Sequence, residues 1–292
     1  MILLSGDFRQ TLPVIPRSTA ADEINACLKS SNLWHNVKKF QLVANMRVTL
    51  LNNPSAEDFY KQLLTIGNGR VPVDKSSGLI SFPPNFCHLV SSKDELIENV
   101  FPNMIDTHKN KEWLSERAIL AAKNKDIDDL NFAIQNVIVD SMHSFESVDC
   151  VINEDEATNY PTEFLNSLDV PRLPPYNLQR KVGSVVIMLR NLNQLKLCNG
   201  TRSVITKLMT NVIKAMILKG KFKGEEVLIP RIPMIPSDMP FEFKRIQFPI
   251  RLAFAMTINK SQGQCTLFTR SIVRGMFTCW QTIRLICFCA RK

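Results

Sequence analysis

The fold class is decided by the stretch Ile119-Leu-Ala-Ala122 and by the pattern that follows it. The four residues are apolar without alternation, which is typical of a short strand buried on both faces of a parallel sheet. Asp126 then predicts a helix cap, and behind it come Leu130, Ile134 and Val137 at helical spacing. A strand followed directly by an amphipathic helix is the repeating unit of α/β proteins, so the sequence predicts an α/β fold.

The segments toward the amino terminus repeat this alternation. Met1 to Leu4 predicts another buried strand, which needs neighbouring strands, so we expect a further segment before it. Three helices are predicted: one capped by Thr19 with Ile24, Cys27 and Leu28 on its apolar face, one starting at Ser55 and Asp58 with Phe59 and Leu63, and one opened by the capping box Ser92 and Glu95 with Leu96 and Val100 one turn apart.

The carboxyl-terminal half has a different character. Residues 160–175 are rich in proline and polar residues and predict a connection. Between Gly183 and Ile235 the sequence then predicts closely spaced strands at 185–189, 203–208, 212–218 and 227–232, with a glycine turn at 219–224. This spacing indicates a small β barrel. Residues 248–258 form one more strand-like apolar run.

Composition excludes several classes of protein. The chain has 292 residues, of which 45% are hydrophobic and 22% charged, which fits a globular protein with two domains rather than a disordered chain. It contains no apolar run of eighteen residues and no secretory leader pattern, so we expect it to stay inside the cell. The eight cysteines include no Cys-x-x-Cys pair and the four histidines stand far apart, which favours reduced thiols and disfavours a zinc site.

The net charge favours a polyanionic partner. The formal charge is +9, and residues 251–292 hold seven basic residues and no acidic one. Such an excess favours nucleic acid as a partner, although a basic surface also serves solubility alone.

Two polar turns near the amino terminus are candidate phosphate sites. In Gly6-Asp-Phe-Arg-Gln-Thr-Leu-Pro13, the amide of Gln10 can hold a water or phosphate oxygen, and Asp7 can accept a hydrogen bond or lie near a metal. The alternative is an ordinary turn capped by Asp7. Arg47, in Asn45-Met-Arg47, can clamp a phosphate with its planar guanidinium; the alternative is a surface or ion-pair arginine.

The third candidate is Thr257-Ile-Asn-Lys-Ser-Gln-Gly-Gln264, which is dense in hydrogen-bond donors and free of acidic residues. Lysine, hydroxyl, amide and backbone N–H groups are the groups that contact a nucleic-acid backbone. A solvated loop is the equally weighted alternative.

Four motifs together resemble a known family. They are Gly-Asp-Phe-Arg-Gln-Thr-Leu-Pro-Val at 6–14, Asn-Met-Arg at 45–47, Leu-Cys-Asn-Gly-Thr-Arg at 197–202 and Ala-Met-Thr-Ile-Asn-Lys-Ser-Gln-Gly-Gln at 255–264. In this order and separation they resemble the Pif-type DNA helicases of superfamily 1B, especially those of Helitron transposons. The resemblance covers about residues 1–264. It implies RecA-like P-loop NTPase domains, the first one truncated, with an SH3-like β-barrel insertion.

The resemblance also implies an activity and site residues. Members use ATP and Mg²⁺ to move 5′ to 3′ on single-stranded DNA, and they have roles in DNA repair, recombination and telomere maintenance. The resemblance also implies a nuclear location. Catalytic roles fall to Gln10, which senses the terminal phosphate, and Arg47, which reaches the γ-phosphate; Gly6 and Asp7 would lie at the nucleotide. Single-stranded DNA would contact Thr257, Lys260, Ser261, Gln262 and Gly263. Asn259 stands where many relatives have histidine, so it is given no role.

The implied domain organisation has five parts. Residues 1–40 would end the first RecA-like domain, 41–180 would begin the second, 181–247 would be the SH3-like insertion, and 248–264 would return to the second domain. Residues 265–292 depart from the family pattern. With permitted codons, the message for Leu267 to Lys292 read one base later encodes the missing motif VI, so we interpret this tail as a frame change or a mis-joined gene model.

The phosphate-cradling Gly-x-x-x-x-Gly-Lys-Ser/Thr loop does not occur in the sequence, and Gly67-Asn-Gly-Arg70 lacks its spacing and its lysine. The acidic pair for magnesium is expected before Met1. We therefore expect a carboxyl-terminal portion that does not bind ATP tightly or hydrolyse it alone. Two alternatives stay open: a non-catalytic remnant that binds single-stranded DNA, and a transposon relic that does not fold stably.

Overall fold

The computed structural model describes residues 19–40, 46, 54–68, 70–73, 76, 90, 92–121, 124–153, 158–170, 172–193, 195–236, 239–257 and 268–271. The chain divides into two compact units. The first comprises Met1–His88, Arg274–Ala290 and Lys292, and the second comprises Leu89–Val273 and Arg291. The strand predicted at Met1 to Leu4 lies outside the described residues.

The named elements in the described part of the first unit are all helices. It contains α1 (Ala20–Asn25), the 3₁₀ helices η1 (Leu28–Ser30) and η2 (Asn32–Asn36), and α3 (Pro54–Gly67). Thr19 caps α1 as predicted: its hydroxyl accepts a hydrogen bond from Asp22 N at 3.3 Å, and the Asp22 carboxylate accepts one from Thr19 N at 2.8 Å.

The predicted apolar face of α1 was wrong. The helix ends at Asn25, so Leu28 lies in η1, and the side chains of Ile24 and Leu28 are 57% and 48% exposed. Helix α3 is confirmed but begins at Pro54, one residue before the predicted start. Proline suits the first helical position because its φ is fixed and its missing N–H has no partner there.

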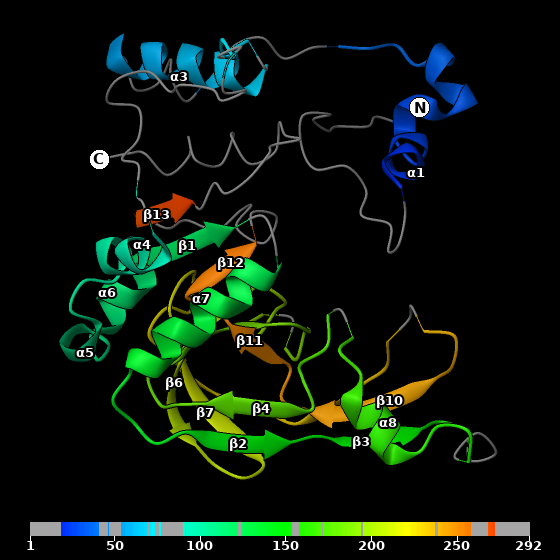
Figure 1. Cartoon of the computed structure of the whole chain (residues 1–292), viewed down its shortest axis with the longest axis vertical. Helices are drawn as coiled ribbons and strands as arrows, with labels where there is room; N and C mark the ends of the chain where they lie inside the picture. The colour runs from blue at the N-terminus through cyan, green and yellow to red at the C-terminus, as the bar shows by residue number, and fades with distance from the viewer. Residues whose placement is uncertain are drawn as a thin grey trace. The chain divides into compact units, whose positions relative to one another are not determined.

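A parallel sheet forms the centre of the second unit. Its order is β12 (Ala255–Thr257), β1 (Arg117–Ala121), β13 (Phe268–Ser271), and both pairings with β1 are parallel. Helix α7 (Asn124–Val137) follows β1 and packs on β1 and β12 (Figure 1). The sheet is also contacted by α4 (Lys93–Val100) and α6 (Lys111–Glu116), and α5 (Met104–Thr107) connects these two. The predicted α/β fold is confirmed.

The helix predictions here hold with one correction. Ser92 caps α4 by accepting a hydrogen bond from Glu95 N at 3.1 Å, and Leu96 and Val100 are buried as predicted. Helix α7, in contrast, begins at Asn124, so Asp126 lies within its first turn rather than at its cap. The predicted apolar residues of α7 are buried except the last, Val137, which is exposed at the helix end.

A five-stranded antiparallel sheet forms a second layer of the same unit. Its order is β11 (Ile250–Leu252), β5 (Val185–Met188), β6 (Arg202–Leu208), β7 (Val212–Ile217), β8 (Glu226–Pro230). The four predicted strands are confirmed, and Gly220 and Gly224 take φ of +90° and +86° in the predicted turn. The run predicted at 248–258 is divided: β11 pairs with β5, and β12 joins the parallel sheet. The SH3-like character of this sheet stays a prediction.

Two smaller sheets complete the unit. In one, β10 (Phe243–Gln247) pairs with β3 (Val148–Val151) and β9 (Ile232–Met234); in the other, β2 (His143–Glu146) pairs with β4 (Asn177–Arg180). The predicted connection at 160–175 contains a helix, α8 (Thr162–Ser167), which corrects the prediction. Its Leu165 is buried against Phe243 and Val170. Among the described residues, no helix is long and apolar enough to cross a membrane.

Candidate functional site at the edge of the parallel sheet

The carboxyl ends of β1 and β12 meet at one edge of the parallel sheet. The register places Ala121 opposite Thr257, so both strands end together. Open α/β sheets bind ligands at this edge. Thr257 is the one predicted site residue that the structure describes. Outside the described residues lie Gly6, Asp7, Gln10, Arg47, Lys260, Ser261, Gln262 and Gly263, whose roles stay predictions.

A single buried amide fixes β12 in this register. The Asn131 side chain on α7 donates from Nδ2 to Ala255 O at 2.9 Å and to Leu252 O at 3.4 Å, and its Oδ1 accepts from Ala255 N at 2.8 Å. The amide thus takes the place of a neighbouring strand at Ala255. Because an unpaired buried backbone group costs about 1–3 kcal/mol, Asn131 stabilises the strand that ends at Thr257.

Apolar packing also holds the segment that precedes Thr257. Ala253, Phe254 and Ala255 are fully buried, and the ring of Phe254 meets that of Phe101 edge-on with centroids 5.9 Å apart. Ile119 N donates to Phe254 O at 2.9 Å, which ties the segment to β1. The residues that lead into Thr257 are therefore held by α7, by β1 and by the ring of Phe101.

The amino terminus of α7 lies at the same edge, since the helix begins three residues after Ala121. A helix amino terminus carries partial positive charge and unpaired N–H groups, which favour anions. The carboxylates of Asp126 and Asp129 both pair with Lys93 of α4 at 3.0 Å. The hydrogen bond with Asp126, followed by that with Asp129, raises the pKa of Lys93. Lys93 thus offsets one of the two negative charges on this part of α7.

The motif at 197–202 forms a turn that leads into β6. Gly200 has a φ of +91° and donates to Met188 O at 2.9 Å, and the Thr201 hydroxyl accepts from Cys198 N at 3.1 Å. Arg202 then reaches the other sheet: its Nη2 donates to Arg117 O at 2.9 Å and to Ala253 O at 3.1 Å. The sequence shows this motif but not the role of its arginine, because the hydrogen-bond partners of Arg202 are 85 and 51 residues away.

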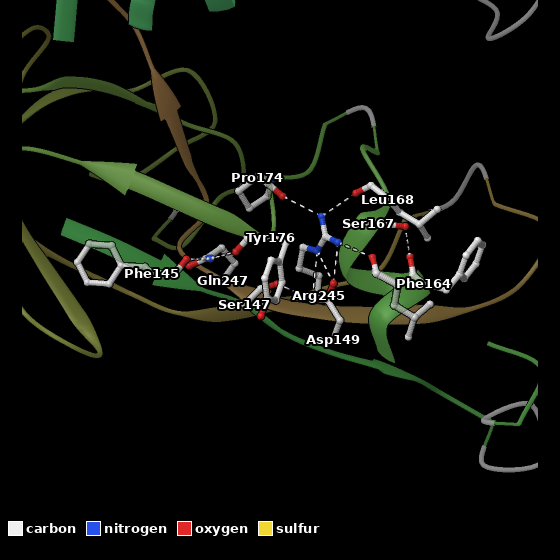
Figure 2. Close-up of polar contacts among 11 residues, drawn as sticks. Phe145, Ser147, Asp149, Phe164, Ser167, Leu168, Pro174, Tyr176, Arg245 and Gln247 are labelled. Carbon is white, nitrogen blue, oxygen red and sulfur yellow. Dashed lines mark hydrogen bonds and ion pairs between the residues drawn. The ribbon is translucent and has the colours of Figure 1, made fainter. Parts of the chain in front are cut away.

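A second buried arginine is structural rather than part of a site. Figure 2 shows Arg245 of β10 with its guanidinium on Asp149 of β3: Nε lies 3.1 and 2.9 Å from the two carboxylate oxygens, and Nη2 lies 2.6 Å from Oδ2. Its remaining donors meet the carbonyl oxygens of Leu165, Leu168 and Pro174 at 2.9–3.2 Å. Neither charged side chain is exposed, so no ligand reaches the pair.

The described residues offer no metal centre: among them, no three His, Cys, Asp or Glu side chains gather closely enough to hold an ion. The residues implied for the nucleotide, Gly6, Asp7 and Gln10, lie outside the described part. The site that the structure does build is the edge at Thr257.

Comparison with known families agrees with this architecture. A family model of PIF1-like helicases matches residues 1–77, and a model of the 2B domain of DNA helicase Pif1 matches residues 163–208. By these two matches the chain is similar to the Pif1-type helicases of superfamily 1B. The 2B match spans α8, β4, β5 and β6 and overlaps the predicted insertion over residues 181–208. The boundaries of the five predicted domains stay predictions.

Two curated Pif1-type relatives show the extent of the likeness. The chain is 26% identical over 167 residues to the ATP-dependent DNA helicase PIF6 of Trypanosoma brucei brucei, covering 48% of this chain and 21% of the relative. It is 22% identical over 265 residues to the ATP-dependent DNA helicase PIF1 of Danio rerio, covering 90% of this chain and 35% of the relative. The chain therefore spans about a fifth to a third of the length of these relatives.

Solved Pif1 structures share the fold. The Pif1 helicase from Candida albicans matches with a TM-score of 0.58 and 18% identity over 97% of this chain and 60% of that chain. Pif1 from Bacteroides in complex with ADP-AlF3 and single-stranded DNA matches with a TM-score of 0.58 and 18% identity over 97% of this chain and 58% of that chain. The fold is thus the RecA-like α/β fold of these helicases.

Proposed function

We propose that this chain binds single-stranded DNA at the carboxyl edge of its parallel sheet, as a part of an ATP-dependent 5′ to 3′ DNA helicase. The observation that carries the proposal is Thr257, the first residue of the donor-rich stretch at 257–264, at the end of β12 beside Ala121. The stretch contains no acidic residue to repel phosphates. The Bacteroides relative with the same fold was solved with single-stranded DNA.

In the complete helicase, we propose ATP and Mg²⁺ as cofactors, with Gln10 and Arg47 acting on the terminal phosphate and Gly6 and Asp7 lying at the nucleotide. Because a helicase of this family acts on DNA, we also propose a nuclear location and roles in repair, recombination and telomere maintenance. The resemblance of the four sequence motifs supports the proposal of an origin in a Helitron transposon. The frame change after Gln264 belongs to the same proposal, and sequencing the transcript across this point tests it.

We further propose that the chain alone is inactive as an ATPase. The printed sequence contains no Gly-x-x-x-x-Gly-Lys-Ser/Thr loop, and the backbone donors and the lysine of that loop hold the β- and γ-phosphates in such enzymes. An upstream segment with this loop would supply the missing contacts. Arg47 would then contribute positive charge to the phosphoryl-transfer transition state.

The DNA-binding proposal is tested by fluorescence anisotropy with a labelled oligothymidylate at several salt concentrations. Lys260→Ala should weaken binding and lower the slope of log Kd against log salt by about one, because one phosphate contact is lost. The matched control is Lys207→Ala at the exposed end of β6, which should change neither value. Salt-independent binding, or a Lys260→Ala variant equal to the control, contradicts the proposal.

The same preparation separates the remaining alternatives. Salt-sensitive binding without ATP turnover supports both an inactive part of a helicase and a non-catalytic remnant. Extending the chain with any P-loop segment that the locus encodes upstream then distinguishes the two, because only the helicase part regains DNA-stimulated ATPase. ATP hydrolysis by the chain alone contradicts the inactivity.

A further inference from the structure

Arg202 is a buried cation with unusually few partners. Its side chain lies at 3% exposure in the second unit, and among the described residues no carboxylate pairs with it. Its Nε and Nη1 atoms have no hydrogen-bond partner in the described part of the chain. Only Nη2 is bonded, to the backbone oxygens of Arg117 and Ala253.

Such an arginine contributes little to stability. Burial lowers its pKa to about 10, because the charged form loses water without gaining a counter-charge. Replacing buried charges by apolar side chains of similar volume is often neutral or stabilising. Arg245, in contrast, has its charge balanced by Asp149 and its donors occupied. The two hydrogen bonds of Arg202 therefore matter for what they hold in place.

Those two carbonyl groups lie where the two sheets meet. Arg117 begins β1, and Ala253 lies between β11 of the antiparallel sheet and β12 of the parallel sheet. Ala253 is also fixed by its N–H, which donates to Val185 O of β5 at 2.8 Å. The antiparallel sheet thus binds both backbone groups of Ala253: Val185 accepts from its N–H, and Arg202 donates to its carbonyl oxygen.

Displacement at Ala253 is passed on to Thr257. Only Phe254, Ala255 and Met256 separate these two residues, and all three are buried in the core. Close-packed segments of this kind move as a unit rather than deforming.

We propose that Arg202 is a positioning residue that ties the antiparallel sheet to Ala253 and Arg117 and thereby sets the place of Thr257 at the DNA-binding edge. The inference rests on the proposed function for its consequence on DNA, but its mechanical part stands on the two hydrogen bonds. Arg202 itself touches no DNA, since it is buried and lies at the amino-terminal end of β1, opposite the edge at Ala121.

The test compares Arg202→Met and Arg202→Lys with Lys207→Met, an exposed position on the same strand. Hydrogen exchange of the full chain, followed by mass spectrometry, should show faster exchange in Arg202→Met for peptides covering residues 252–257 but unchanged exchange in the β7–β8 hairpin. Arg202→Lys retains a donor and a charge and should restore part of the protection. Equal protection of 252–257 in Arg202→Met and the wild type overturns the inference.

Anisotropy with labelled oligothymidylate supplies the second measurement. Arg202→Met should weaken binding about three- to tenfold, with the salt slope unchanged because no phosphate contact is lost. A slope lowered by about one assigns Arg202 to direct phosphate contact instead and overturns the positioning role. If the wild type shows no salt-sensitive binding, the proposed function fails, and hydrogen exchange alone decides whether Arg202 holds the segment.

Discussion

At the scale of single residues, the buried arginines Arg202 and Arg245 behave differently because their surroundings differ. Arg245 has a carboxylate partner and three carbonyl acceptors, and Ser147 donates to the same carboxylate at 2.7 Å. The network ties β10 and β3 to α8 and to the chain after it (Figure 2). Removing one member leaves the other charge buried without its partner.

We expect Arg245→Met or Asp149→Leu alone to lower the free energy of unfolding by about 3–5 kcal/mol, and the double variant to recover much of this loss, because no unpaired charge is then left. Urea unfolding followed by circular dichroism measures both. The control is Arg251→Met, which removes a partly exposed pair with Asp128 and should cost at most about 1 kcal/mol. Single variants that cost no more than this control would show that the network contributes little.

Sequence reasoning at this scale succeeded where the interaction is local. Thr19 and Ser92 cap their helices through partners three residues away, so the pattern alone reveals them. Asn131 and Arg202 were missed because their hydrogen bonds span 124 and 85 residues and depend on the tertiary fold. A polar side chain within an apolar helix pattern, such as Asn131 after Leu130, was the one available signal for the first of them.

At the scale of elements, α4 and α7 are joined by Lys93, which lies 3.0 Å from both Asp126 and Asp129. These hydrogen bonds raise the pKa of Lys93 above 10.5 in the folded protein. A raised pKa means that the folded state binds the proton more tightly, so the contribution to stability is complete below 10.5 and is lost as the pH rises through the folded pKa.

Lys93→Met should therefore lower the free energy of unfolding at neutral pH by about 0.5–1 kcal/mol, because the lysine is partly exposed. The difference from the wild type should shrink as the pH is raised above 10.5. Urea midpoints of both proteins across this range measure the difference, and Lys125→Met, an exposed lysine of α7, serves as the control. A deficit in Lys93→Met that stays constant with pH would show that packing rather than charge is responsible.

Prediction of elements failed mainly for short strands with distant partners. β3 pairs with β10, so that Asp149 meets Arg245 across 96 residues, and neither strand showed a clear pattern of its own. Helix α8, whose N-cap is Pro161, was hidden by the prolines around it. The strands of the antiparallel sheet were found because β-branched residues and glycine turns recur along them.

At the scale of the whole molecule, the two compact units differ in the burial of their apolar residues. The described part of the second unit contains three clusters of buried side chains, which include Ile134, Ile213 and Phe243 respectively. In the described part of the first unit, large side chains face solvent, among them Leu33 at 74% and Phe40 at 80% exposure. Since apolar burial is the dominant driving force of folding, the second unit is expected to be the more stable.

We accordingly expect two separate steps on heating, with the first unit unfolding before the second. Hydrogen exchange of the full chain should show fast exchange in peptides of α1 and slow exchange in β1, α7 and β6, since opening energies follow the buried contacts of each region. Differential scanning calorimetry measures the steps, and Arg245→Met is the control, because it should shift the second step alone. A single sharp transition would show that the units stabilise each other, whereas one broad transition without protection in β1 would favour the relic that does not fold stably.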